Sequence, residues 1–245
     1  AHVATLSSTF FGAISGSAPA TTSAIGAVMV PEMEKRSYDK AFTAAVVAAS
    51  GTIGLIIPPS NTMVMYGTLA NASVGKMFIG GVGPGLLMTA VIIIINYVIS
   101  KKRGYVGTER VTAKEVATAF KNGIWALLMP VIILGGIFGG IFTPTESAAV
   151  AVVYALLVSL LIYKDIKIKD IPCIFVDGAI STATILLLVG ISKSSGYVVT
   201  TSGLPHQVLE VFSSFTNSTV VILLLLNILF LVIGMLMEAN AAIIM

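Results

Sequence analysis

A short polar segment near the beginning of the sequence could bind a monovalent cation. Residues 12–22 (GAISGSAPATT) interrupt an apolar stretch with glycine, proline and hydroxyl side chains. Apolar, helix-like sequence lies on both sides, and Pro19 is well placed as the first residue of a returning helix. We therefore predict a helical hairpin whose tip carries the hydroxyl groups of Ser15 and Ser17.

A second segment should release backbone oxygen atoms within an apolar run. Pro58 and Pro59 lie inside a long charge-free stretch, and proline has no N–H to donate to the carbonyl four residues earlier. The carbonyl groups of Gly54 and Leu55 would then lack helical partners, which costs several kcal/mol for each in hydrocarbon. Water, another helix or a cation must meet these oxygens, and the polar residues 60–62 add side-chain oxygens.

These two segments favour sodium over protons as the bound ion. Carbonyls at the C-terminal ends of half-helices bind cations, and half-helix N-termini attract anions. Proton coupling usually needs buried carboxylates or histidines, and few acidic residues lie in apolar segments, namely Glu146, Asp177 and Glu238. Glu146 follows Thr143 and Pro144 with the spacing of a helix-capping box, and a role in proton or ion binding is the alternative.

The overall composition places these segments in a membrane. Charged residues make up 10 % of the 245 residues and apolar residues 56 %, whereas soluble domains carry about 25 % charge. A soluble domain and a disordered chain are both excluded. Since about 20 apolar residues suffice for a helix to cross the hydrocarbon, the sequence predicts an all-α integral membrane protein with broken transmembrane helices. Its charge-free runs are 41–75, 77–100, 122–145, 147–163 and 211–237.

The basic residues predict the orientation in the membrane. Most of them lie in three short loops, 32–40, 101–121 and 164–169, which the positive-inside rule places in the cytoplasm. Two apolar runs separate each loop from the next, so each pair of crossings returns the chain to the same side. These loops explain the net charge of +3, which indicates no nucleic-acid binding.

A third polar interruption, at 234–242 (GMLMEANAA), shares a weak pattern with the first hairpin and would be entered from the opposite side of the membrane. Two such re-entrant hairpins are typical of the inverted-topology repeats of ion-coupled transporters. We accordingly expect a hairpin and broken helix of the transport domain in 1–66, connecting and scaffold helices in 67–170, and an outward-crossing helix with an incomplete second hairpin in 171–245. The sequence is expected to be a fragment of a longer membrane protein.

The same segments resemble the large permease subunit of tripartite ATP-independent periplasmic (TRAP) transporters. The resemblance implies a multi-pass, sodium-coupled permease of the bacterial inner membrane that works as an elevator, in which a mobile domain with both hairpins slides against a scaffold. It also implies a small membrane subunit, a periplasmic substrate-binding protein and an organic acid substrate, such as sialic acid or a C4-dicarboxylate. The matching motifs are HVATLSS at 2–8, SGSAPATTSAIG at 15–26, VPEM at 30–33, ASGTIGLIIPPS at 49–60, GGIFTPTESAAVA at 139–151 and GMLMEANAAII at 234–244.

By the family pattern, two sodium (Na⁺) sites are expected. The first would combine the first hairpin tip with the double-proline break, through Ser15, Ser17, Gly54, Ile57 and Pro59. The second would use the other hairpin tip, through Gly234, Met237 and Asn240. The carboxylate-bearing substrate would lie between the two tips near mid-membrane, in polar contact with Ser17, Asn61 and Thr62.

Two other functions stay open on the sequence. A related sodium-coupled di- or tricarboxylate carrier would share the fold and the ion chemistry but would need no binding protein. An intramembrane serine hydrolase would need a base close to Ser15, yet His2 is far away along the sequence and His206 is outside by the predicted topology. We therefore expect a transporter component and not an enzyme.

Overall fold

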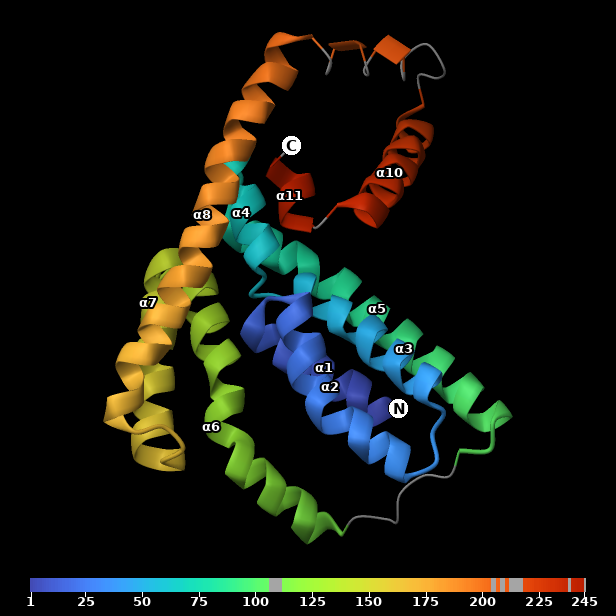
Figure 1. Cartoon of the computed structure of the whole chain (residues 1–245), viewed down its shortest axis with the longest axis vertical. Helices are drawn as coiled ribbons and strands as arrows, with labels where there is room; N and C mark the ends of the chain where they lie inside the picture. The colour runs from blue at the N-terminus through green and yellow to red at the C-terminus, as the bar shows by residue number, and fades with distance from the viewer. Residues whose placement is uncertain (106–111, 204–205, 208–209, 212–217, 238, 245) are drawn as a thin grey trace. The chain divides into compact units, whose positions relative to one another are not determined.

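The computed structural model describes residues 1–105, 112–203, 206–207, 210–211, 218–237 and 239–244 (Figure 1). Every regular element in these ranges is helical, which confirms the predicted all-α class. The chain forms two compact units, Ala1–Asp165 and Ile166–Met245. The predicted division into the parts 1–66, 67–170 and 171–245 concerns their roles in transport and stays a prediction.

The polar segment near the beginning forms the turn of a helical hairpin. Helix α1 (His2–Ser15) ends at Gly16, whose φ of 61° is the left-handed conformation that glycine adopts after helix ends. Helix α2 (Ala18–Lys35) begins after Ser17, whose hydroxyl accepts a backbone N–H from the first turn and so caps the helix. The predicted helix–turn–helix is confirmed, although Pro19 is the second residue of the returning helix and not the first.

The double proline breaks the following helix, as predicted. Helix α3 (Lys40–Gly51) continues into a short 3-10 turn, η1 (Thr52–Leu55), and helical structure resumes in α4 (Asn61–Leu69). The peptide bond between Pro58 and Pro59 is cis. Because neither proline can donate a backbone hydrogen bond, a regular helix cannot run through them.

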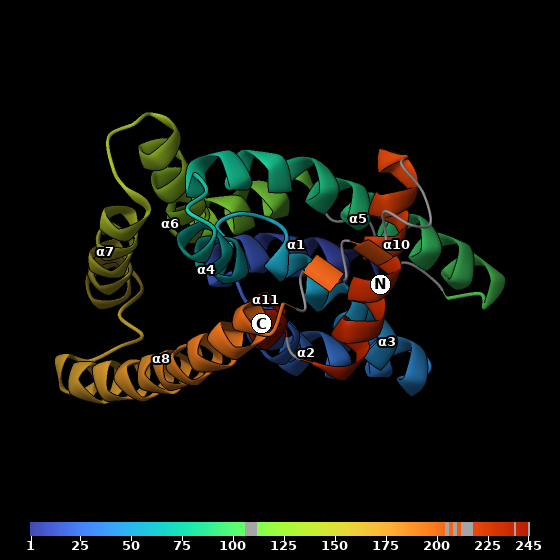
Figure 2. The same cartoon turned by 90° about the horizontal axis from the view of Figure 1, so that it is seen from above.

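Helices α1, α2 and α3 pack side by side, and α5 (Val74–Lys102) lies along α1 and α3 (Figures 1 and 2). A buried network joins three of these helices. The Asn96 amide donates to the Thr5 hydroxyl (2.9 Å), which also bonds to the Ser50 hydroxyl (2.9 Å). Such polar contacts between membrane helices contribute about 0.6–1.7 kcal/mol each, so this network holds the hairpin and α3 against α5.

Small residues on α5 let it approach the broken helix closely. A Cβ atom on Gly81 would lie 2.7 Å from the Ile56 carbonyl oxygen, and one on Gly85 would lie 2.5 Å from Cγ1 of Ile57. Glycine at these two positions therefore makes room for the irregular segment that carries the two prolines.

Two of the predicted basic loops meet at one end of the first unit. Arg103 Nη1 lies 3.4 Å from Asp39 Oδ1, and the Asp39 N–H donates to the Tyr105 hydroxyl (3.1 Å). The loop after α2 and the loop after α5 are therefore on the same side, as the predicted topology requires. Of the predicted loop 101–121, residues 106–111 lie outside the described residues.

The next two helices, α6 (Ala113–Phe138) and α7 (Pro144–Leu157), form an antiparallel pair. Helix α7 continues into the π-helical turn η2 (Val158–Tyr163). The Tyr163 hydroxyl donates to the Asn122 carbonyl (2.7 Å), so the end of η2 lies beside the beginning of α6. A Cβ atom on Gly75, after the turn between α4 and α5, would lie 3.5 Å from Ile137 near the end of α6. The turn between α4 and α5 and the turn between α6 and α7 are thus close together, in agreement with the predicted order of crossings.

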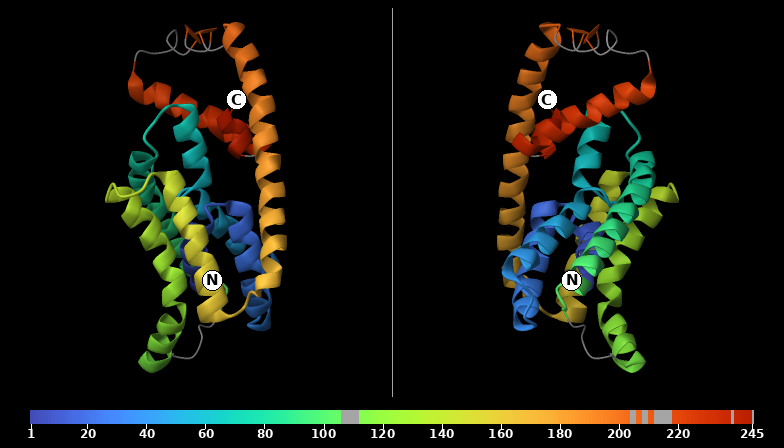
Figure 3. Two further views of the ribbon diagram at one scale, coloured as in Figure 1. Left: turned by 90° about the vertical axis from the view of Figure 1, so that its left-hand side faces the viewer. Right: turned by 90° about the vertical axis from the view of Figure 1, so that its right-hand side faces the viewer.

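The second unit contains a long helix and an interrupted one (Figure 3). Helix α8 (Ile171–Thr201) follows the 3-10 turn η3 (Ile168–Asp170). Helix α10 (Thr219–Leu236) is followed by the short α11 (Ala239–Ile244), which packs against α8. The predicted third interruption is present at Met237, where the backbone is extended.

Five helical segments of the described residues are long and apolar enough to cross a membrane by their length and composition. This agrees with the predicted multi-pass membrane protein. The segments are Val74–Lys102, Ala113–Phe138, Pro144–Tyr163, Ile168–Thr201 and Thr219–Leu236.

Candidate functional site

The tip of the first hairpin lies against the double-proline break. The Asn61 N–H donates to the Gly16 carbonyl (3.3 Å), and a Cβ atom on Gly16 would lie 2.8 Å from the Pro59 carbonyl oxygen. One turn earlier in α1, a Cβ atom on Gly12 would lie 2.7 Å from the Cα of Gly54. Backbone touches backbone along this contact, which we call the tip–break contact, and only glycine leaves room for it.

Three oxygen atoms converge at the tip–break contact. The Ser15 hydroxyl lies 2.9 Å from the Thr21 hydroxyl and 3.3 Å from the Ser17 carbonyl oxygen, which accepts the Thr21 hydroxyl at 2.7 Å. A Cβ atom on Gly54 would lie 2.8 Å from Thr21 Oγ1 and 3.2 Å from the Ser17 carbonyl oxygen. The structure thus brings together Ser15, Ser17 and Gly54, three residues predicted for the first sodium site.

The Gly54 carbonyl has lost its helical partners, as the double proline predicts. The N–H three residues later, on Ile57, donates to the Ile53 carbonyl instead (2.9 Å). The residue four positions later is Pro58, which has no N–H to donate. The Gly54 oxygen therefore needs a partner other than a helical N–H, such as an ion or a water molecule.

The Leu55 carbonyl lacks a helical partner, as predicted, but side-chain hydroxyls meet it in place of water, another helix or a cation. The Ser60 hydroxyl donates to it, and Thr62 Oγ1 lies 3.3 Å from the same oxygen. Ser60 and Thr62 also bond to each other (2.8 Å) and are 1 % and 7 % exposed. Short hydroxyl side chains can reach back to a nearby backbone group, and here they satisfy one of the two carbonyls that the prolines release.

The other two residues predicted for the first site lie on the same irregular segment. Pro59 presents its carbonyl oxygen to the hairpin tip at Gly16, whereas the Ile57 side chain packs against Gly85 of α5. Their role as sodium ligands stays a prediction that depends on the family resemblance.

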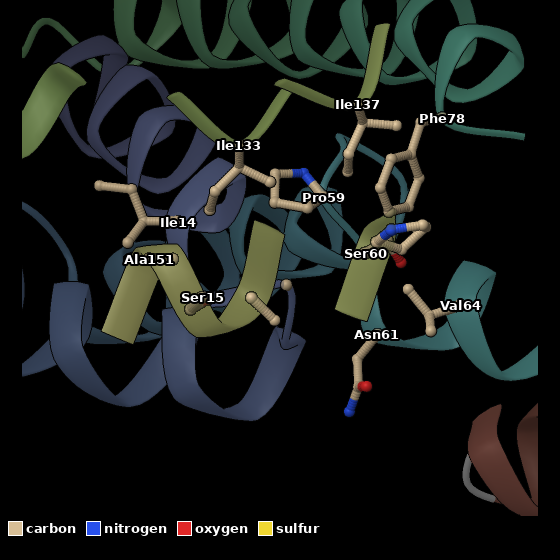
Figure 4. Close-up of a pocket in the computed structure, with 13 residues that line it drawn as sticks. Ile14, Ser15, Pro59, Ser60, Asn61, Val64, Phe78, Ile133, Ile137 and Ala151 are labelled. Carbon is tan, nitrogen blue, oxygen red and sulfur yellow. The ribbon is translucent and has the colours of Figure 1, made fainter. Parts of the chain in front are cut away.

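A cavity of about 280 Å³ lies beside the tip–break contact (Figure 4). Its polar lining comes from Ser15, Ser60 and Asn61, and its apolar lining includes Phe78 and Ile133. The exposed Asn61 amide extends away from Ile133 in Figure 4. The volume is near the lower end of the range for small-molecule sites, roughly 300–1,000 Å³.

Of the three residues predicted to contact the substrate, Asn61 lines this cavity. The Ser17 hydroxyl instead caps α2, and the Thr62 hydroxyl is buried against the Leu55 carbonyl. The geometry therefore offers no support for a substrate contact by Thr62. Ser60 lines the cavity but was not predicted, although its position directly before the polar pair 61–62 could have indicated it.

The predicted second sodium site falls in the second unit and stays a prediction. Gly234 lies inside α10, where a Cβ atom would meet no atom within 4 Å, so the interruption does not begin there. An isolated glycine inside a helix is tolerated. Met237 forms the extended break, Asn240 lies in α11, and Glu238 is outside the described residues.

The donor set at the tip–break contact fits a sodium ion. Ser15 and Thr21 offer hydroxyl oxygens and Ser17 offers a carbonyl oxygen, all neutral, beside the Gly54 backbone. Unwound backbone carbonyls at broken helices are the groups with which secondary transporters bind Na⁺. In the part of the chain that the structure describes, no group of three or more His, Cys, Asp or Glu could hold a metal ion.

The hydrolase alternative finds no base for its nucleophile. The Ser15 hydroxyl bonds to the Thr21 hydroxyl and to the backbone of Ser17. His2 lies at the opposite end of α1. A serine nucleophile needs a general base within hydrogen-bond reach, and these contacts supply none.

Glu146 caps helix α7, as its spacing predicts. The N–H and the hydroxyl of Thr143 both donate to Glu146 Oε2 at 2.8 Å. In return, the Glu146 N–H donates to the Thr143 hydroxyl at 3.3 Å. These reciprocal bonds form a capping box, which occupies the carboxylate at the helix terminus.

We expect Glu146→Gln to retain sodium-dependent uptake, because an amide oxygen can accept the same two bonds from Thr143. Glu146→Ala should lower the melting temperature, since it removes the cap. Uptake by the complete transporter and thermal unfolding in detergent would check both variants. If Glu146→Gln abolished uptake at unchanged thermal stability, the carboxylate would have a proton or ion role.

The chain matches one protein family over its full length. Residues 1–245 match the family model described as "Tripartite ATP-independent periplasmic transporter, DctM component". This match includes the first hairpin, the double-proline break and the capping box, which are the features that build the candidate site.

Several curated proteins are similar to this chain. It is 43 % identical over 236 residues to an isethionate TRAP transporter permease protein DctMQ of Oleidesulfovibrio alaskensis, covering 96 % of this chain and 37 % of that protein. It is 36 % identical over 243 residues to a C4-dicarboxylate TRAP transporter large permease protein DctM of Pseudomonas aeruginosa, covering 99 % and 57 %. It is 35 % identical over 240 residues to the sialic acid TRAP transporter permease protein SiaT of Haemophilus influenzae, covering 98 % and 39 %. The chain thus spans about half the length of these relatives or less.

Proposed function

This chain belongs to the DctM component family of tripartite ATP-independent periplasmic (TRAP) transporters, and we propose that it forms part of a large permease subunit that imports an organic acid together with sodium ions. Its relatives are described as permeases for isethionate, C4-dicarboxylates and sialic acid, which are all organic acids. The protein would lie in the bacterial inner membrane. A small membrane subunit and a periplasmic substrate-binding protein would be its partners.

The observation that carries the sodium proposal is the oxygen cluster at the tip–break contact. Ser15 Oγ, the Ser17 carbonyl and Thr21 Oγ1 lie within 2.7–3.3 Å of one another, beside the Gly54 backbone. The Gly54 carbonyl lacks both of its helical donors there. Neutral oxygens grouped around a broken helix support a monovalent cation more readily than a titrating proton.

We further propose that the first hairpin is re-entrant. The N-terminus of α2 meets the break, while its C-terminus leads to Asp39, which contacts Arg103 at the basic end of the unit. Helix α3 starts near that basic end and runs to the break. Helix α4 starts on the other side of the break. At 1.5 Å per residue, the 18 residues of α2 cover about 27 Å, less than the roughly 30 Å of hydrocarbon. The tip would therefore lie within the membrane, and the hairpin would enter the membrane from the cytoplasmic side.

An elevator mechanism requires that the ion site and the elements around it move as one body. The backbone contacts between the tip and the break, and the Asn96–Thr5–Ser50 network, support this for α1 to α5. The proposed mobile part would accordingly extend past residue 66 to include α5, and both hairpins would belong to it.

The organic acid would bind in the cavity beside the tip. Helix α4 begins at Asn61 in the cavity wall, and the N-terminus of a helix carries partial positive charge that attracts carboxylates. The hydroxyls of Ser15 and Ser60 and the Asn61 amide are polar groups of the same wall.

Replacing Ser15 by alanine in the complete transporter is expected to raise the sodium concentration for half-maximal uptake about tenfold or more, which corresponds to about 1.4 kcal/mol of lost binding. The measurement is uptake of isethionate, succinate or sialic acid into proteoliposomes across a series of sodium concentrations. Ser181→Ala serves as the control, because the Ser181 hydroxyl bonds to the Asp177 carbonyl of its own exposed helix. An unchanged sodium dependence in Ser15→Ala would refute the site.

The same proteoliposomes distinguish the carrier that needs no binding protein. We expect uptake to require the added periplasmic binding protein. Equal uptake without it would assign the chain to the alternative class of di- and tricarboxylate carriers, although the family match argues against that class.

A further inference from the structure

Thr21 lies at the oxygen cluster of the tip–break contact; it belongs to the polar segment 12–22 but is not among the residues predicted for the first sodium site. It is fully buried (0 % exposed) near the beginning of α2. We propose that Thr21 Oγ1 is a further ligand of the cation at this site, an inference that rests on the sodium function proposed above. It follows from three features of the Thr21 hydroxyl: the direction of its proton, its neighbours and its distance from the broken helix.

The proton of the Thr21 hydroxyl is already used within α2. Thr21 Oγ1 donates to the Ser17 carbonyl oxygen at 2.7 Å, and the Thr21 N–H donates to the same oxygen at 3.0 Å. A hydroxyl that donates its one proton still has lone pairs with which it can accept a bond. Its lone pairs face the Ser15 hydroxyl, 2.9 Å away. Thr21 therefore presents an acceptor, and not a donor, to the space beside Ser15.

The hydroxyls next to Thr21 in sequence have other partners. The Ser17 hydroxyl accepts the Ala20 N–H as the cap of α2. The Thr22 hydroxyl is turned toward α3, where a Cβ atom on Gly51 would lie 1.9 Å from Thr22 Oγ1. At the beginning of α2, Thr21 is accordingly the residue that brings a side-chain oxygen to the cluster, while Ser17 contributes its carbonyl.

Thr21 Oγ1 also lies closer to the broken helix than the Ser17 carbonyl oxygen does. A Cβ atom on Gly54 would lie 2.8 Å from Thr21 Oγ1 and 3.2 Å from the Ser17 carbonyl oxygen. Gly54 is the residue whose carbonyl has lost its helical donors. A cation bound by Ser15 beside the Gly54 backbone would also lie near Thr21 Oγ1, and the Ser15 proton would only have to turn away from Thr21.

The test compares oxygen-free and oxygen-bearing side chains at position 21 in the purified complete transporter. Thr21→Val and Thr21→Ala remove the oxygen, and Thr21→Ser keeps it. The readout is the rise in melting temperature between choline chloride and sodium chloride at equal ionic strength, because an ion that binds the folded state stabilises it by an amount that grows with the logarithm of its concentration divided by its dissociation constant. Thr68→Val is the matched control, since the Thr68 hydroxyl is exposed and bonds only to carbonyls of its own helix, α4.

We expect Thr21→Val and Thr21→Ala to require about tenfold more sodium for the same stabilisation, whereas Thr21→Ser and Thr68→Val respond like the parent protein. If Thr21→Val is already unfolded in choline chloride, Thr21→Ala decides the matter. A parental sodium response in either folded, oxygen-free variant overturns the proposal. Ser15→Ala separates the two hypotheses: if Ser15→Ala loses the response and Thr21→Ala keeps it, the sodium site stands without Thr21, and if both keep it, the sodium site itself is wrong.

Discussion

Gly54→Ala is expected to abolish sodium-dependent uptake, because it places a methyl group inside the tip–break contact. The added Cβ would lie 2.8 Å from Thr21 Oγ1 and 3.2 Å from both the Gly12 Cα and the Ser17 carbonyl oxygen. Two of these three neighbours are backbone atoms, which cannot turn aside as a side chain can. The hairpin would have to move away from η1, and overpacking of this kind costs about 1–3 kcal/mol.

The matched control for this variant is Gly80→Ala on α5. A Cβ atom on Gly80 would meet no atom within 4 Å, and alanine favours a helix over glycine by about 1 kcal/mol. Uptake against sodium concentration and thermal unfolding, both on the complete transporter, would be measured side by side. Normal sodium-dependent uptake by Gly54→Ala would show that the closeness of tip and break is irrelevant to ion binding.

Gly16→Ala should lower uptake nearly as much, for two separate reasons. The residue has a φ of 61°, a conformation that costs a residue with a Cβ atom roughly 1–2 kcal/mol. In addition, the new Cβ would lie 2.8 Å from the Pro59 carbonyl oxygen and 3.2 Å from the Asn61 N. We expect the hydrogen bond from the Asn61 N–H to the Gly16 carbonyl to break and the tip to separate from the break.

Gly140→Ala is a control that separates the steric clash with Pro59 and Asn61 from the backbone strain. Gly140 has a similar φ of 67°, but a Cβ atom there would meet nothing within 4 Å. Both variants should show similar backbone strain in thermal unfolding, while only Gly16→Ala should lose the sodium-induced stabilisation and uptake. Equal loss of uptake in the two variants would attribute the effect to backbone strain alone and would contradict the proposed contact.

Local chemistry made the helices, the hairpin turn and the break predictable from the amino-acid sequence. Two successive prolines lack N–H groups and remove two helical hydrogen bonds in a row, which favours a break at this point. Gly16 and Ser17 suit a left-handed helix end and the following cap, and Thr143 and Glu146 have the spacing of a capping box. Each of these features depends on hydrogen bonds between residues a few positions apart, and the charge-free runs likewise follow from composition.

The composition of the oxygen cluster, by contrast, could be known only after folding. The sequence predicted that the Leu55 carbonyl would lose its helical partner and that Thr62 would contact the substrate, but not that the hydroxyls of Ser60 and Thr62 would lie against that carbonyl. It also gave no sign that Thr21 would stand beside Gly54. Which hydroxyl meets which carbonyl depends on how far α1 and α2 are rotated about their axes against η1. Contacts between residues distant in the chain set that rotation, chiefly the approach of Gly12 to Gly54, and no local pattern encodes it.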